Sequence, residues 1–220
     1  MAGALAPAAL ASASGPGESL RGRGIVAGTA LYLFGEVHAC GEAPALPAAQ
    51  IYVSTDQGAT WEKRGPALAG SELLFAREDR GTLWAAGEHT AEGPAIDPFY
   101  LVPTSRPAAF TWTVRTIREG PAELLGASGG RRALSASLRP TDAHGGPLPG
   151  GAVRYRSRDG GRSWRREDGA SGPPSLARIT TRSGRWRIVD RRDGGFDVQR
   201  AAARGWALGK EFPWAACPAR

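Results

Sequence analysis

Two eight-residue stretches, STDQGATW at residues 54–61 and SRDGGRSW at residues 157–164, share the pattern S-x-D-x-G-x-x-W. Serine and aspartate side chains hydrogen-bond to backbone groups across tight turns, and glycine adopts the positive φ that other residues resist. The closing tryptophan can bury a large apolar surface beside the turn. Each stretch is therefore predicted to form a hairpin turn, built by Ser54, Asp56, Gly58 and Trp61 in the first copy and by Ser157, Asp159, Gly161 and Trp164 in the second.

The spacing of tryptophans extends this pattern to four copies. Trp61, Trp112, Trp164 and Trp206 follow one another at intervals of 51, 52 and 42 residues. The segments SRPAAFTW and QRAAARGW, which end at Trp112 and Trp206, have lost the aspartate and the glycine but keep the tryptophan. A second pair of similar segments, GTALYLFGE at 28–36 and GTLWAAGE at 81–88, repeats at nearly the same interval. The chain is therefore a repeat protein with a unit of about 50 residues.

Each unit is predicted to be a four-stranded antiparallel meander. In the second unit, short apolar runs at 71–78, 82–88, 97–104 and 110–117 are separated by Gly, Pro and Asp, which is typical of strands joined by turns. One such sheet per repeat predicts an all-β fold, a β-propeller with four recognisable four-stranded meander blades. The expected organisation is a disordered Ala-rich leader or partial export signal at 1–17 and a propeller domain at 18–220, with units of approximately 18–70, 71–120, 121–172 and 173–214.

The amino-acid composition argues against two classes of protein, those that span a membrane and those that bind nucleic acid. No apolar run reaches the 18 residues that a membrane-spanning helix needs. The net charge of +7 is uneven, since residues 1–130 carry −4 and residues 131–220 carry +11. A basic half attracts anions, but 26 of the 28 basic residues are arginine, a bias that a GC-rich coding sequence produces without any ligand. We therefore do not predict a nucleic-acid partner, and no motif predicts a cofactor.

The two intact boxes resemble the Asp-box, or BNR, repeat of the sialidase-like superfamily of propellers. The resemblance implies a blade turn between the third and fourth strands, away from any active site. Sialidases use an arginine triad, a tyrosine nucleophile with a glutamate, and an aspartate acid/base, but these residues do not carry over. The first-arginine motif F/Y-R-I-P is reduced to ARIT at 177–180, and Tyr32, Tyr52, Tyr100 and Tyr155 all lie in predicted strands.

Two functions follow from this resemblance. The preferred one is a non-catalytic binding or scaffold module, extracytoplasmic or secreted, for a glycan or a protein partner. The alternative is a sialidase-like glycoside hydrolase with a degenerate active site. Whether the chain is an enzyme is left open. Four blades could close by themselves or belong to a ring completed by another copy or by missing sequence, so an oligomer is also left open.

Aligning the units places four charged residues at one repeat position. Glu36, Glu88, Arg139 and Arg191 are spaced by 52, 51 and 52 residues and are predicted to surround the mouth of a central channel. There they could bind a polar ligand such as a sugar, or they could neutralise one another as ion pairs between blades.

The remaining candidate residues have structural alternatives. His38, His89 and His144 are predicted in loops after second strands, where they could be solvated, and no metal site is predicted. Trp84 and Trp186 are expected to pack within blades. Cys40 and Cys217 could form a disulfide that closes the ring outside the reducing cytosol.

Overall fold

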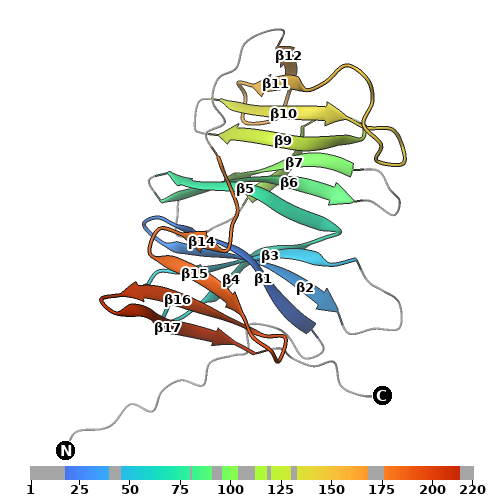
Figure 1. Cartoon of the computed structure of the whole chain (residues 1–220). Helices are drawn as coiled ribbons and strands as arrows, with labels where there is room; N and C mark the ends of the chain where they lie inside the picture. The colour runs from blue at the N-terminus through green and yellow to red at the C-terminus, as the bar shows by residue number, and fades with distance from the viewer. Residues whose placement is uncertain are drawn as a thin grey trace, which may run out of the picture.

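The computed structural model describes residues 18–39, 46–79, 81–90, 96–103, 112–117, 120–129, 133–167 and 176–213, and every helix or strand in them is a strand. The strands form four antiparallel sheets in the order of the chain, as Figure 1 shows. The all-β prediction with four blades is confirmed. The predicted leader at 1–17 and the predicted pairing of Cys40 with Cys217 lie outside the described residues. Within the described residues, no helix has the length and hydropathy of a membrane span.

The first two blades follow the predicted meander closely. The first blade contains β1 (Glu18–Ala27), β2 (Leu31–Ala39), β3 (Ala48–Ser54) and β4 (Glu62–Ala69). The second contains β5 (Ser71–Asp79), β6 (Thr82–Thr90), β7 (Ile96–Pro103) and β8 (Trp112–Thr116). The middle strands β3 and β6 are buried on both faces, whereas the outer strand β4 is largely exposed. Each of these two blades therefore packs between two neighbours and turns its outer edge to solvent.

The third and fourth blades repeat this arrangement with shorter strands. The third contains β9 (Ala122–Gly129), β10 (Leu134–Pro140), β11 (Val153–Ser157) and β12 (Arg165–Glu167). The fourth contains β14 (Arg182–Ser183), β15 (Trp186–Asp190), β16 (Phe196–Ala202) and β17 (Gly205–Phe212). How the chain divides into units stays a prediction, because sheets alone do not define folding units.

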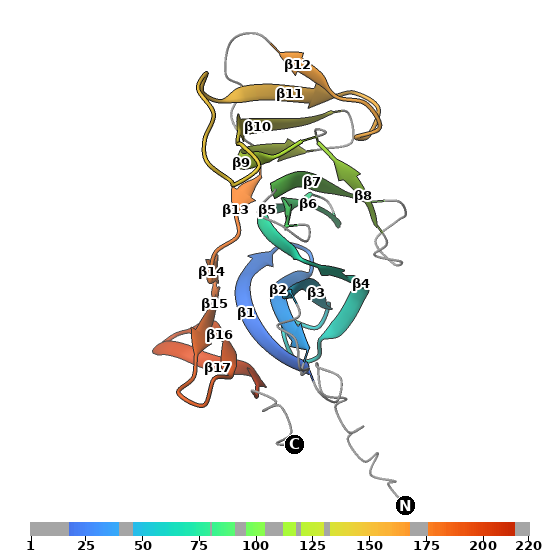
Figure 2. The same ribbon diagram turned by 90° about the vertical axis from the view of Figure 1, so that its right-hand side faces the viewer.

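The blades stack as an open arc. Among the described residues, three buried apolar clusters lie between adjacent blades: one joins the first and second, one the second and third, and one the fourth and first. The spatial order is therefore fourth, first, second, third. Figures 1 and 2 agree that the third and fourth blades lie at opposite ends of the stack.

A crossing segment carries the chain from the third blade to the fourth along the inner strands. The Leu176 N–H donates to the Ala127 carbonyl of the third blade over 3.1 Å. The two-residue strand β13 (Ala177–Arg178) then pairs with β5 of the second blade. Finally, the Ile25 N–H of the first blade donates to the Thr180 carbonyl over 2.9 Å. This segment ties three blades together and delivers the fourth beside the first, as Figure 2 shows along one side of the stack.

Both intact boxes form the predicted turn with the same hydrogen bonds. In each, the serine hydroxyl donates to the aspartate Oδ1 over 2.8 Å. The Gly58 N–H donates to Ser54 Oγ over 2.7 Å, and the Gly161 N–H donates to Ser157 Oγ over 2.8 Å. The two glycines have φ angles of 87° and 82°. The boxes therefore connect the third and fourth strands of the first and third blades, as the sequence predicts.

Three of the four repeat tryptophans join their blade to the blade before it in the arc. Trp61 contacts Phe212 of the fourth blade edge-on, with ring centroids 6.1 Å apart. Trp112 packs in the cluster between the first and second blades. Trp164 stacks on Tyr100 of the second blade at 5.6 Å. In the first three blades the box tryptophan is therefore an inter-blade anchor, and this role accounts for Trp112 in a copy that lacks the aspartate.

Candidate functional site

The residues that surround the candidate site lie where the first and second blades meet, near the ends of their second strands. Gly70 forms the connection between these blades, with its N–H bonded to the Pro47 carbonyl over 3.0 Å and its own carbonyl accepting from the Thr90 N–H over 2.6 Å. Its φ is 61°, and a Cβ there would approach the Thr90 carbonyl oxygen to 2.6 Å. Glycine is therefore required at the point where the two blades separate.

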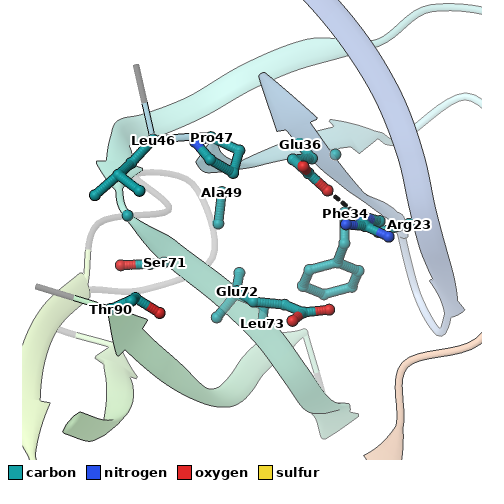
Figure 3. A pocket seen from close by; sticks show the side chains of 12 residues that line it. Arg23, Phe34, Glu36, Leu46, Pro47, Ala49, Ser71, Glu72, Leu73 and Thr90 are labelled. Carbon is teal, nitrogen blue, oxygen red and sulfur yellow. Dashed lines mark hydrogen bonds and ion pairs between the residues drawn. The ribbon is translucent and has the colours of Figure 1, made fainter. Parts of the chain in front are cut away.

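Between the two blades is a cavity of about 190 Å³. Its wall combines apolar and polar side chains, as Figure 3 shows. The apolar side chains are Phe34, Leu46, Pro47, Ala49 and Leu73, and the polar ones are Arg23, Glu36, Ser71, Glu72 and Thr90. Such a mixed lining is typical of sites for small ligands that combine an apolar surface with hydrogen-bonding groups.

The Glu36 carboxylate is held by two cationic or donor groups of its own blade. The Arg23 guanidinium donates to one carboxylate oxygen through Nε. His38 Nε2 lies 2.9 Å from the other oxygen. The Glu36 side chain is only 13% exposed, so this arrangement fixes the carboxylate at the cavity edge.

Glu72 approaches the same part of the cavity from the second blade. Figure 3 shows its carboxylate on the side of the cavity where Arg23 and Glu36 lie. Ser71, next to it on β5, places Oγ 3.0 Å from His89 Nδ1 on β6. The cavity thus presents carboxylate, guanidinium and hydroxyl groups from both blades.

Of the four residues predicted at a channel mouth, Glu36 alone lines this cavity. Glu36, Glu88 and Arg139 lie in β2, β6 and β10, and Arg191 follows β15, so all four occupy equivalent positions at second strands. The ends of these strands lie along one edge of the stack in Figure 1. Because the blades form an arc, the equivalent positions follow that edge in a row instead of surrounding a channel.

Each of the other three residues has partners in its own or the adjacent blade. Glu88 accepts a hydrogen bond from the Leu124 N–H of the third blade, and burial raises the pKa of its carboxyl. Arg139 pairs with Glu123. Arg191 pairs with Asp193 at 2.8 Å, Glu211 at 3.2 Å and Asp197 at 3.6 Å. The described residues do not show the alternative arrangement, in which these four side chains form ion pairs with one another. Ligand binding by the four residues stays a prediction.

The positions of the histidines correct one sequence prediction. His38 and His89 lie within β2 and β6, not in the loops after them, because these strands continue two or more residues further than the apolar pattern indicates. His144 does lie in a loop, after β10. Among the described residues, no group of three or more potential ligands could hold a metal ion.

The aromatic residues considered as ligand platforms or nucleophiles are packed in the blades. Trp84 and Trp186 are 6% and 7% exposed, which confirms the prediction that they pack within blades. Tyr32, Tyr52 and Tyr100 are buried as well. Burial raises the pKa of Tyr32 to about 12, with a further contribution from Glu78. The phenols of these three tyrosines are therefore poorly placed to attack a substrate.

Sequence reasoning missed Arg23, Ser71 and Glu72. All three lie on first strands, whereas the repeat alignment compared second strands. A cavity between blades combines the second strand of one unit with the first strand of the next. Aligning a single repeat position does not reveal such a combination.

Comparisons with known proteins agree with the repeat. The BNR/Asp-box repeat family matches residues 52–63. This chain carries a BNR/Asp-box repeat. Together with its four meander blades, the repeat makes it a BNR-type β-propeller chain.

Other comparisons add little about function. No curated protein matches the chain. A solved structure of Penicillium chrysogenum alpha-L-arabinanase complexed with arabinobiose is similar, with a TM-score of 0.41 and 15% sequence identity. The similarity covers 91% of this chain and 65% of that chain.

Proposed function

We propose that this propeller is a non-catalytic module that binds a carbohydrate in the cavity between its first and second blades. The observation that carries the proposal is the mixed lining of that cavity. A sugar ring has C–H faces that pack on apolar and aromatic walls such as Phe34 and Leu73. Its hydroxyl groups donate to carboxylates such as Glu36 and Glu72 and accept from guanidinium and hydroxyl groups.

The chemistry of the cavity favours binding over hydrolysis. Glycoside hydrolysis needs a pair of carboxyl groups with different protonation states, one acting as an acid. Glu36 is bonded to Arg23 and His38, contacts that restrict the movement of its carboxylate. A tyrosine nucleophile is also disfavoured, because Tyr32, Tyr52 and Tyr100 are buried. The same proposal includes export of the chain, because the glycans that it would bind are extracellular.

A glycan array probed with the purified protein tests this function. The Glu72→Ala variant removes an exposed carboxylate from the cavity, and Glu62→Ala removes an exposed carboxylate from β4, where it pairs with Arg64. We expect the wild type and Glu62→Ala to bind the same glycan and Glu72→Ala to lose at least about tenfold in affinity, as for a hydrogen bond to a charged group. The proposal fails if no glycan binds, or if the two variants bind equally.

A hydrolysis assay separates the alternative function. The wild type is incubated with a fluorogenic sialoside, and release of the fluorophore is followed over time. We expect no release above that of the heat-denatured protein. Turnover by the wild type that Glu72→Gln abolishes would instead support the sialidase-like hydrolase.

A further inference from the structure

A second cavity lies on the opposite edge of the stack, between the first and fourth blades. Its volume is about 270 Å³. Three hairpin turns meet there: the β1–β2 turn of the first blade, the box turn after β3, and the β14–β15 turn of the fourth blade. It is separate from the carbohydrate cavity, because Leu31 at the start of β2 lines it, whereas Glu36 near the end of β2 lines the other.

The charged side chains that line this second cavity are both cationic. Arg185 comes from the β14–β15 turn and Arg200 from β16, and the remaining lining residues are uncharged. Two carboxylates contact lining residues from outside: Glu78 accepts from Thr29, and Asp56 accepts from Ser54. Both carboxylates are already occupied by donors, since Glu78 also accepts from the Gly81 N–H and Asp56 from the Thr60 N–H.

The two guanidinium groups differ in how they are held. Arg200 donates to Gln57 Oε1 over 2.8 Å and lies over the Trp186 ring, 5.8 Å from its centroid. Arg200 is therefore positioned by the first blade. The Arg185 side chain makes no hydrogen bond or ion pair with another described residue, so its five N–H donors remain available to a ligand.

The rest of the lining suits a small organic anion. Leu31 and the buried Trp186 ring supply apolar surface, and the Thr55 hydroxyl supplies a further hydrogen-bond donor. Guanidinium groups bind carboxylate, sulfate and phosphate through paired, charge-assisted hydrogen bonds. From this geometry we infer that the cavity between the first and fourth blades is a binding site for a monosaccharide-sized organic oxyanion, held by Arg185 and Arg200.

Binding of sodium glucuronate, with glucose as the neutral counterpart, tests the inference. Calorimetric titration of the full chain is expected to detect glucuronate and not glucose, because the two share a ring and differ in the carboxylate. Sodium sulfate and sodium phosphate are titrated in parallel to distinguish carboxylate from other oxyanions. We expect sulfate and phosphate each to compete with glucuronate. The strength of this competition ranks carboxylate, sulfate and phosphate by their affinity for the cavity.

Three variants locate the bound anion. Arg185→Ala and Arg200→Ala are each expected to weaken glucuronate binding by about tenfold or more, the size of one charge-assisted hydrogen bond. Arg165→Ala, at an exposed arginine of the third blade, is the matched control and should bind as the wild type does. Arg185→Ala removes no side-chain hydrogen bond or ion pair with a described residue. The test therefore remains valid even if Arg200→Ala disrupts the interface between the first and fourth blades.

Several outcomes would overturn the inference. The first is that glucose binds as strongly as glucuronate, and the second is that glucuronate does not bind. The third is that Arg165→Ala and Arg185→Ala weaken glucuronate binding equally. Because Glu72 belongs to the other cavity, Glu72→Ala should leave glucuronate binding unchanged. The two proposals can therefore fail independently.

Discussion

The phenolic oxygen of Tyr100 lies 2.7 Å from the carbonyl oxygen of Ser128. It is equally close to the Ser135 carbonyl, which faces Ser128 across the β9–β10 pair. A side chain of the second blade thus bonds to two strands of the third. The contact adds directed hydrogen bonding beside the apolar cluster that joins these two blades.

Replacing Tyr100 by phenylalanine should lower the free energy of unfolding by about 1–2 kcal/mol, because the half-buried Ser128 and Ser135 carbonyls lose their shared donor. Chemical denaturation monitored by tryptophan fluorescence measures the change. Tyr155→Phe is the control, since Tyr155 packs against the same cluster and its hydroxyl makes no hydrogen bond to a described residue. Equal losses in the two variants would assign the effect to packing and contradict the role of the hydroxyl.

The Asp56 carboxylate should make stability depend on pH in the acid range. Its pKa is lowered to about 2, chiefly by hydrogen bonds from the Thr60 hydroxyl and backbone N–H. A carboxyl whose pKa is lowered by folding stabilises the fold above its unfolded pKa, about 4, and this contribution is lost as the pH falls toward 2. Asp56→Asn should therefore reduce the melting temperature by about 2–4 °C at pH 7, and the difference should shrink toward pH 2.

Thermal melts at several pH values between 2 and 7 measure this difference. Asp190→Asn, at an exposed aspartate at the end of β15, is the control and should shift the melting temperature little at any pH. A gap between Asp56→Asn and the wild type that stays constant down to pH 2 would contradict the prediction.

Glu88 should show the opposite pH dependence. Burial raises the pKa of its carboxyl, so the ionised side chain costs stability as the pH rises above the unfolded value of about 4.3. Glutamine keeps an oxygen that can accept from the Leu124 N–H but never ionises. Glu88→Gln should therefore melt at or above the wild-type temperature at pH 8 and close to it at pH 4.

Glu88→Ala supplies the comparison, because it also removes the acceptor of the Leu124 N–H and should be less stable than Glu88→Gln at both pH values. If Glu88→Gln were less stable relative to the wild type at pH 8 than at pH 4, the ionised carboxylate would be stabilising and the prediction would be wrong.

The blades could be predicted from the sequence because each box turn is a local structure. Ser54, Asp56 and Gly58 contact residues within a few positions, and so do their equivalents in the third blade. Their pattern therefore survives in the sequence as a repeated motif. The pairing of the strands beside these turns is also local, since each strand pairs with the next strand along the chain.

The arrangement of the blades could not be predicted, because it depends on long-range contacts without a motif. The pairing of Ile25 with Thr180, which brings the fourth blade to the first, joins two residues that no repeat position relates. Trp206 illustrates the consequence. The guanidinium groups of Arg187 and Arg182, in its own sheet, lie 4.3 and 5.3 Å from the centroid of its ring. Trp61 and Trp164 instead contact an adjacent blade. The candidate cavity was missed for the same reason, since it lies between blades.

The contact between Gly58 and Trp186 should make the first box intolerant of any side chain at its glycine. Gly58 has a positive φ, and a Cβ there would lie 2.9 Å from Cζ3 of the Trp186 ring in the fourth blade. Gly160, beside the glycine of the second box, has a φ of 71° and no atom within 4 Å of the corresponding Cβ. Gly160→Ala should therefore cost only the backbone strain of roughly 1–2 kcal/mol, whereas Gly58→Ala should cost roughly 1–3 kcal/mol more through overpacking. Denaturant unfolding of both variants measures the difference, and the near-ultraviolet circular dichroism of Gly58→Ala should change because Trp186 must move. If the two alanine variants were equally stable, the fourth blade would not be packed on the first box as the structure has it.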